Sequence, residues 1–333
     1  MPIRVPARAD STWGYEVRTS SVWKALIALV VTLVALQEPV AAHAEPTPIR
    51  AYIIGDSYSA GTGLGDFTGR ADCDRDWGTY AWRALLKLRS DDGRRISASM
   101  AACSGATTSR MIDRQLSGLN ASYNVAVLTA GGNDLNFSGR VKTCVLFGCS
   151  RDTQNLGSTP LPSWDDLFNR LVRLYTSTRM QMAPDGHLYV VTYPVAFAGQ
   201  GALICEGMSL RDQGAANAFI TRLDDTIWQA VQRARSDVQA QGRAGNIHFV
   251  EWRTGHVATY TSPSHQRFRA YWNSSEGLCN SQGNRPFLNG LTPTGASPSE
   301  GPTAYLGNSF HPNSTGYWYA AVQLSDSIRR YQG

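Results

Sequence analysis

The sequence predicts an α/β fold, a three-layer α/β/α sandwich in which a mainly parallel, five-stranded sheet lies between two layers of helices. Short apolar runs of strand length alternate along the chain with longer segments whose apolar residues recur at helical spacing. Three of the predicted strands end in turns of small polar residues, which is typical of the carboxyl edge of a parallel sheet. The chain shows no internal repeat and no convincing second domain.

The N-terminal segment, residues 1–44, has the pattern of an export signal. Its basic residues come first, and they are Arg4, Arg8, Arg18 and Lys24. An apolar run from Ala25 to Leu36 follows, which is too short to span a bilayer comfortably. Ala42-His43-Ala44 then offers the small-x-small pattern that signal peptidase requires. We therefore expect cleavage near Ala44, secretion without stable membrane insertion, and a single domain over residues 45–333.

Charge and cysteine content limit the classes of function. The formal net charge is +5 and the basic residues are scattered, which argues against nucleic-acid binding because that needs a concentrated basic face. An even number of cysteines in an exported chain predicts three disulfides, for which fifteen pairings exist. We expect no metal site, because there is no Cys-x-x-Cys pair and no histidine at ligand spacing from a cysteine. All the cysteines follow residue 44: Cys73, Cys103, Cys144, Cys149, Cys205 and Cys279.

The first predicted strand, Arg50–Ile54, is a β-branched and aromatic run that stops abruptly at Gly55-Asp56-Ser57. Ligands bind at the carboxyl ends of strands in open α/β sheets, so Ser57 is a candidate nucleophile with an accessible hydroxyl. The alternative is that Ser57 caps the next helix. The glycines that continue to Gly65 do not match a phosphate loop, because no Lys-Ser or Lys-Thr follows them.

Two further strand ends carry candidate oxyanion donors. A strand over Ile96–Ala102 precedes Gly105, which can bring a bare backbone N–H close to a ligand. A strand over Tyr123–Thr129 precedes Gly131-Gly132-Asn133-Asp134, where Asn133 can donate its side-chain amide to a developing oxyanion. The alternative for both Gly105 and Asn133 is an ordinary turn residue.

The remaining segments complete the alternation of strands and helices. Residues 137–163 are interpreted as a surface excursion in which Cys144 and Cys149 are close enough to close a small loop. Residues 254–307 form a long loop rich in aromatic, Ser, Asn, Gly and Pro residues, which we expect to line the rim of the active site. Helices are predicted over Trp77–Arg89, Trp164–Met182, Ala215 to near Gly242, and from a cap at Ser314 or Thr315, with strands over His187–Thr192 and Ile247–Glu251.

A serine nucleophile needs a base, and His311 is the candidate. It stands in a loop immediately before a proline and a helix cap, which can hold an imidazole rigidly at the edge of a pocket. His187 and His248 lie inside predicted strands and are expected to be structural. His256 and His265 lie in the long irregular segment.

Taken in order, these motifs resemble the four blocks of the SGNH, or GDSL, hydrolase family: Gly55-Asp56-Ser57, Gly105, Gly131-Gly132-Asn133-Asp134 and His311-Pro312-Asn313. The resemblance covers essentially the whole chain after the signal. It implies a flavodoxin-like fold and cleavage of esters or thioesters through an acyl-enzyme, with no cofactor and no metal. It also implies the site roles: Ser57 as nucleophile and backbone oxyanion donor, Gly105 as second backbone donor, Asn133 as side-chain donor and His311 as general base.

One position departs from the family pattern. The aspartate that commonly lies three residues before the histidine is replaced by Asn308, and no acidic residue occurs between Gly301 and His311. The chain resembles exported actinobacterial members with three disulfides, some of which work as a Ser-His dyad with a main-chain carbonyl in place of the carboxylate. We therefore expect the Asn308 carbonyl, or its side-chain oxygen, to orient His311. The cysteine order of that subgroup implies the pairs Cys73–Cys103, Cys144–Cys149 and Cys205–Cys279.

The expected function is that of a secreted carboxylic ester hydrolase, an esterase or lipase, which acts as a monomer on a small-molecule or lipid ester. A phospholipase or a carbohydrate deacetylase would use the same residues with a different rim. An inactive exported binding protein on the same scaffold is the alternative from another class, because the aspartate is missing. Trp252, Tyr271 and Trp272 are candidates for a lipid or sugar surface, although aromatic residues in a long loop are more often local packing.

Overall fold

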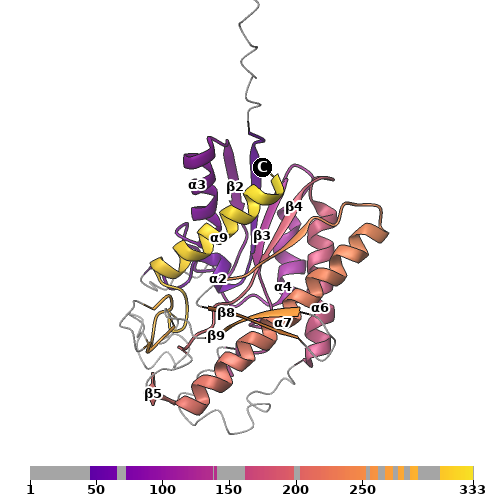
Figure 1. Ribbon diagram of the computed structural model, residues 1–333. Coiled ribbons are helices and arrows are strands. Elements are labelled where there is room, and N and C mark those ends of the chain that lie inside the picture. Colours follow the sequence, from indigo (N-terminus) through magenta and orange to yellow (C-terminus); the bar gives the residue numbers. More distant parts are fainter. Residues whose placement is uncertain are drawn as a thin grey trace, which may run out of the picture. The chain divides into compact units, whose positions relative to one another are not determined.

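The five predicted strands form one parallel sheet in the order β2-β1-β3-β4-β7 (Figure 1). Their bounds are β1 Ile49–Gly55, β2 Ile96–Met100, β3 Val125–Thr129, β4 His187–Val191 and β7 Ile247–Val250. The structure is a computed structural model that describes residues 46–65, 73–137, 139–140, 162–198, 203–252, 256–261, 267–272, 277–280, 286–291 and 308–332.

The central strands are apolar on both faces, which suits them to a parallel sheet. Every residue of β3 is buried, and β1 exposes only Arg50. Strands that are buried on both faces need helices above and below them. β2, at the edge of the sheet, is only partly buried along its length.

Two pairs of helices cover the sheet. α3 (Tyr80–Asp92) packs against α9 (Ser314–Gln332), and α6 (Trp164–Gln181) packs against α7 (Leu210–Ala240) (Figure 1). Right-handed crossovers place α3, which leads from β1 back to β2, on the face opposite α6 and α7, which lead onward from β3 to β7. The predicted three-layer α/β/α architecture is therefore confirmed. These elements belong to one compact unit, Pro46–Gly333.

The strand order reverses between β1 and β3, because the chain passes from β1 to β2 on one side and then to β3 on the other. Open α/β sheets bind ligands outside the carboxyl ends of their strands at such a switch point. The turns that begin at Gly55 and Ala130 leave β1 and β3 at this edge. The fold thus brings the first and third predicted motifs together.

The bounds of α3 differ from the prediction for a local reason. The helix begins at Tyr80 rather than at Trp77, and it continues to Asp92. Gly93 ends it in the left-handed conformation, with φ 67°, a conformation that a glycine adopts without steric cost. The capping glycine, and not the last apolar residue, therefore sets the end of the helix.

Caps also set the beginnings of α7 and α9. α7 begins at Leu210, earlier than predicted, because the hydroxyl of Ser209 caps it. The predicted cap of α9 at Ser314 or Thr315 is wrong. The Oδ1 of Asn313 accepts the first backbone N–H groups of that helix at 3.0 and 3.1 Å, so Asn313 is the capping residue.

The prediction that residues 254–307 are irregular is wrong in part. β8 (His256–Thr261) and β9 (Arg267–Trp272) form an antiparallel hairpin within this segment. Both strands are rich in β-branched and aromatic residues, which favour strands. The Ser, Gly and Pro content of the surrounding segment hid this local preference.

Helical turns between β2 and β3 were not predicted. The chain passes from α4 (Thr108–Arg110) through one π-helical turn, η1 (Met111–Gln115), to a 3₁₀ turn, η2 (Leu116–Gly118). Because the winding changes twice within eleven residues, no 3.6-residue apolar period develops. A short hairpin, β5 (Ile204–Cys205) and β6 (Met208–Ser209), precedes α7 and was also not predicted.

Two of the expected disulfides lie in the described residues. Cys73 is bonded to Cys103, and Cys205 is bonded to Cys279, which matches the pairing that the cysteine order implied. Cys144 and Cys149 lie outside the described residues, as do the predicted signal segment 1–44 and His265. Within the described part of the chain, no helix is both long enough and apolar enough to cross a bilayer.

His187 and His248 meet at the amino edge of the sheet, and their structural role is confirmed. His187 Nδ1 and His248 Nε2 lie 2.9 Å apart, and the His248 ring stacks on Tyr331 with centroids 3.8 Å apart. Burial, followed by the charges of His187 and Arg235, lowers the pKa of His248 to about 3. Burial also lowers the pKa of His187, so both rings stay neutral in the folded protein at neutral pH.

The contribution of His248 to stability should therefore fall in acid, and His248→Phe should remove that contribution. An unfolded histidine binds a proton below about pH 6.5, whereas folded His248 does so only near its lowered pKa. The titration of His248 should thus lower the free energy of unfolding by up to about 1.4 kcal/mol per pH unit below pH 6. In urea titrations at pH 7.5, 6 and 5, the free energy of unfolding of the phenylalanine variant should rise relative to that of wild type as the pH falls.

Comparing wild type with His248→Phe isolates the contribution of His248 to the pH dependence from the contributions of other buried groups. Burial raises the pKa of Asp56 to about 7, and this favours the folded state in acid in both proteins. The opposing contribution cancels in the difference between their unfolding free energies. Parallel pH curves for wild type and variant would contradict the assignment.

Candidate active site

The turn after β1 places Ser57 at the carboxyl edge of the sheet. Ser57 is the first residue of α2 (Ser57–Ala60), and Asp56 caps this helix by accepting from the N–H of Tyr58 at 3.0 Å. A Cβ on Gly55, whose φ is 128°, would lie 2.6 Å from the carbonyl oxygen of Thr129. Glycine is therefore required where the strand turns into the helix. The cap is Asp56, so the alternative role of Ser57 as the capping residue is wrong.

A buried phenol connects this turn to the turn after β3. The hydroxyl of Tyr193 donates to the Asp56 carboxylate. The same hydroxyl accepts from the backbone N–H of Gly132 at 3.0 Å. Burial raises the pKa of Asp56 to about 7, and the hydrogen bond from Tyr193 partly opposes this shift. Tyr193 thus fixes the relative positions of two turns that are far apart in sequence.

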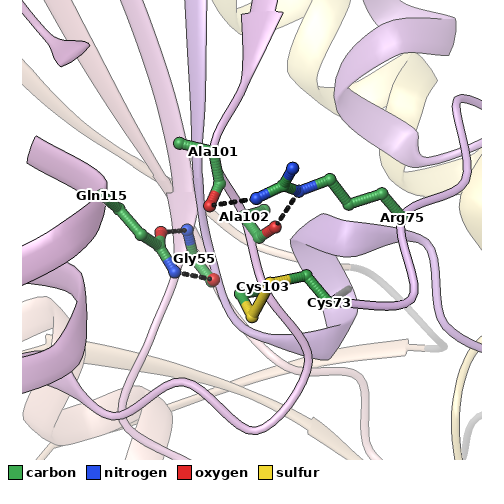
Figure 2. Close-up of a disulfide and its surroundings, with 7 residues drawn as sticks. All are labelled: Gly55, Cys73, Arg75, Ala101, Ala102, Cys103 and Gln115. Atoms are coloured by element: carbon green, nitrogen blue, oxygen red, sulfur yellow. Dashed lines mark hydrogen bonds between the residues drawn. A yellow bond between two sulfur atoms is a disulfide. The ribbon is translucent and has the colours of Figure 1, made fainter. Parts of the chain in front are cut away.

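Gln115 completes the hydrogen bonding of Gly55 (Figure 2). Its side-chain amide donates to the Gly55 carbonyl at 2.9 Å and accepts from the Gly55 N–H at 2.8 Å. The pairing of β1 with β2 ends at Ile53 and Met100, so Gly55 has no strand partner on that side. The Gln115 amide supplies the hydrogen bonds that a neighbouring strand would otherwise make with Gly55, and it holds the end of β1 in place.

The turn that carries Gly105 is held to the loop that follows Ser57 in the sequence. The Cys73–Cys103 disulfide joins them, and Arg75 Nε donates to the carbonyl of Ala102 at 2.7 Å (Figure 2). The Cys103 N–H in turn donates to the Gly55 carbonyl at 3.0 Å. Gly105 has φ 73°, and no described atom lies within 4 Å of the position that its Cβ would take.

Asn133 meets the Gly105 turn from the other side. Its Nδ2 donates to the carbonyl of Ala106 at 3.1 Å. The carboxylate of the next residue, Asp134, accepts from the N–H and the hydroxyl of Thr108 at 2.9 and 2.6 Å. The two turns that carry the predicted oxyanion donors are therefore bound to each other. An amide has two N–H groups, so Asn133 retains one that can bind a further acceptor.

His311 reaches Ser57 from the loop before α9. Its Nε2 lies 2.8 Å from Ser57 Oγ, which is the distance of a hydrogen bond between a base and a serine hydroxyl. Phe310, the residue before it, has φ 60°, a left-handed conformation that is strained for a bulky side chain. The hydroxyl of Tyr58 donates to the Phe310 carbonyl at 2.7 Å and so secures this loop to α2.

Asn308 lies in the same loop and is buried. Its carbonyl accepts from the backbone N–H of His311 at 3.2 Å, and its Nδ2 donates to the carbonyl of Gly65 at 3.1 Å. These contacts place Asn308 beside His311 and hold it to the loop after Ser57. The expected contact between the Asn308 carbonyl and the imidazole ring stays a prediction.

Trp252 does not fit the expectation of a lipid or sugar surface. It is only 2% exposed, and it packs edge to face against Tyr58 and Tyr80 with centroids 5.8 and 5.4 Å apart. Its role is local packing beneath the site. Tyr271 and Trp272 belong to β9, whose backbone alone is described.

The arrangement joins a serine, a base and amide donors, which together suit nucleophilic attack on an acyl carbon. Sequence reasoning singled out Ser57, Gly105, Asn133 and His311 as candidates, but it did not single out Gln115, Tyr193 or the contacts of Asp134. Within the described ranges, no group of three or more histidine, cysteine, aspartate or glutamate side chains is placed to hold a metal ion.

Known proteins resemble this chain in sequence. Residues 53–319 match the GDSL-like Lipase/Acylhydrolase family. The chain is 29% identical over 190 residues to Lipase 1 of Streptomyces coelicolor (strain ATCC BAA-471 / A3(2) / M145), which covers 56% of this chain and 67% of that protein. It is 30% identical over 166 residues to a lipase of Streptomyces rimosus, which covers 50% of this chain and 59% of that protein.

Solved structures share the fold. An extracellular lipase from Streptomyces rimosus aligns with a TM-score of 0.54 and 22% identity, over 84% of this chain and 99% of that chain. A phospholipase A1 from Streptomyces albidoflavus NA297 aligns with a TM-score of 0.55 and 21% identity, over the same shares of the two chains. At these identities the likeness establishes the architecture alone.

Proposed function

The chain belongs to the GDSL-like lipase/acylhydrolase family of serine ester hydrolases, and from this premise we propose that it is a secreted carboxylic ester hydrolase that uses a Ser57-His311 dyad. The observation that carries the proposal is the 2.8 Å separation of His311 Nε2 and Ser57 Oγ at the carboxyl edge of the sheet. The Streptomyces relatives named as lipases support the same reaction class.

The dyad supplies both proton transfers. His311 Nε2 accepts the hydroxyl proton as Ser57 Oγ attacks the ester carbonyl carbon, and a tetrahedral intermediate forms. The backbone N–H groups of Ser57 and Gly105 and the Asn133 amide stabilise its oxyanion. The imidazolium then gives its proton to the departing alcohol. Water, activated by His311, releases the acid from the acyl-enzyme.

Secretion is part of the proposal and rests on the sequence. Residues 1–44 have the order of a signal peptide, with basic residues, an apolar run and a small-x-small motif. The Cys73–Cys103 and Cys205–Cys279 disulfides suit an oxidising compartment. N-terminal sequencing of protein from the culture medium should find a start near Glu45, whereas retention of residues 1–44 would contradict cleavage.

A series of p-nitrophenyl esters from acetate to palmitate tests the activity, with Ser57→Ala as the control. We expect turnover by wild type and its loss in the variant. A long-chain optimum would identify a lipase and a short-chain optimum an esterase. Phosphatidylcholine and acetylated xylan, assayed in parallel, test the phospholipase and deacetylase alternatives. No turnover of any ester would contradict the proposal and favour a binding protein.

Asn308→Ala should retain most of the activity, because alanine keeps the main-chain carbonyl proposed to orient His311. We expect kcat/KM to fall less than about tenfold, together with a loss of roughly 1 kcal/mol in unfolding free energy from the broken bond to Gly65. Ester hydrolysis and urea unfolding measure the two effects. If the folded variant lost more than about a thousandfold in kcat/KM, the side chain would be the orienting group.

A further inference from the structure

A second segment holds the histidine loop in place, and it belongs to the long segment, residues 254–307, that the sequence analysis placed at the rim of the active site. Phe287 accepts from the N–H of Asn313 at 2.9 Å. Asn289 exchanges two backbone hydrogen bonds with the loop, donating to the His311 carbonyl and accepting from the Phe310 N–H, each at 2.9 Å. The segment 286–289 therefore runs alongside residues 310–313, with an isolated antiparallel bridge between Leu288 and Pro312.

The side chain of Asn289 extends this contact toward Ser57. Its Nδ2 donates to the carbonyl of Gly63 at 3.0 Å and approaches the carbonyl of Asn308 at 3.5 Å. Gly63 follows α2, whose first residue is Ser57. One amide group therefore connects the segment that follows the serine with the segment that carries the histidine.

Close packing makes this connection sensitive to position. A Cβ on Gly63 would lie 2.9 Å from the Cβ of His311 and 3.0 Å from Nδ2 of Asn289. The backbone of Gly63 thus lies directly against both residues. A shift of Gly63 relative to Asn289 would change the distance between the loop of His311 and the turn of Ser57.

We propose that Asn289 is a positioning residue whose amide holds His311 within reach of Ser57, an inference that rests on the proposed dyad. In this chain Asn308 stands where family members commonly have an aspartate, so the loop lacks that charged group to orient the imidazole. Neutral hydrogen bonds from Asn289 to main-chain carbonyls restrain the loop in its place. The amide contacts the main-chain carbonyls of Gly63 and Asn308, so it acts on the spacing of the hydroxyl and the imidazole through the backbone.

Asn289→Ala tests the amide without removing the two backbone bonds. We expect kcat on p-nitrophenyl butyrate to fall about 10- to 100-fold with KM changed less than twofold, because small displacements of reacting groups cost about this much. Asn289→Asp keeps the shape but loses the N–H donors, and it should lose as much. Wild-type kcat in either folded variant would overturn the proposal.

A double-mutant cycle with His311→Ala separates positioning from a general structural role. If Asn289 acts through the imidazole, Asn289→Ala should have no further effect on the residual turnover of His311→Ala. An equal loss in both backgrounds would mean that Asn289 merely supports the fold, and it would overturn the proposal. Asn246→Ala is the matched control and should be fully active. It removes a hydrogen bond from a side-chain amide to the Asp185 carbonyl at the amino edge of the sheet, away from Ser57.

The same measurements distinguish failure of this inference from failure of the proposed function. Loss of turnover in His311→Ala together with wild-type turnover in Asn289→Ala would overturn the positioning role alone. Unchanged turnover in His311→Ala would overturn the dyad itself, and with it the role of Asn289.

Discussion

Ser57→Ala and His311→Ala are each expected to lower kcat on a p-nitrophenyl ester by about 10⁵- to 10⁶-fold, and the double variant should be no slower than either one. Attack by the hydroxyl requires removal of its proton, and the imidazole nitrogen that can accept this proton lies 2.8 Å away. Since neither group works without the other, removing the second costs nothing more. The residual rate reflects the oxyanion donors and substrate binding alone.

Steady-state hydrolysis at high enzyme concentration measures these rates, and titration with a fluorophosphonate counts the reactive serine. We expect one labelled site in wild type and none in Ser57→Ala. Ser117→Ala removes an exposed hydroxyl bonded to the Arg114 carbonyl and should leave the rate unchanged. Retention of more than a few percent of wild-type kcat in Ser57→Ala would contradict the assignment.

The residues proposed to react could be singled out from the sequence because each follows a strand or precedes a helix with its own local signal. Gly55 and Ser57 end a buried apolar run, and a parallel sheet brings all such ends to one edge. The pattern of the sequence therefore predicted the place of the candidate site as well as its residue types. The same apolar runs predicted the strands of the sheet. β3, for example, is buried along its whole length, as its apolar sequence indicates.

The residues that hold the site together could not be predicted in this way. Gln115, Tyr193 and Asn289 each bind a main-chain group or carboxylate far away in sequence, and such partners leave no periodic pattern. Gln115 lies in a π-helical turn whose winding differs from that of its neighbours. The pairing of Gln115 with Gly55 depends on the pairing of β1 with β2, which ends at Ile53 and so leaves Gly55 without a strand partner on that side.

Hydrogen bonds from capping side chains set the helix boundaries that the apolar periodicity did not predict. Apolar spacing marks the middle of a helix, whereas capping side chains such as those of Ser209 and Asn313 set its first residue. The β8–β9 hairpin has strand-forming residues, but it lies between stretches of loop composition. Composition averaged over residues 254–307 therefore concealed it.

The position of Asn133, a proposed oxyanion donor, depends on tertiary contacts. Its amide binds the Ala106 carbonyl at 3.1 Å, and the neighbouring carboxylate of Asp134 binds Thr108 through both oxygens. The hydroxyl of Tyr193 fixes Gly132 on the other side. The amide is thus held in place before substrate arrives, which is what makes an oxyanion donor effective.

Asn133→Ala should therefore lower kcat by about 10²- to 10³-fold while KM changes little, because the donor binds charge that develops only in the transition state. Asn133→Asp should lose at least as much, since a carboxylate repels the oxyanion. Hydrolysis of the ester series measures both constants, and Asn120→Ala, an exposed asparagine bonded to the Gly118 carbonyl, is the control. A loss confined to KM, or a kcat within fivefold of wild type, would exclude Asn133 from the oxyanion hole and leave the backbone N–H groups of Ser57 and Gly105 to stabilise the intermediate.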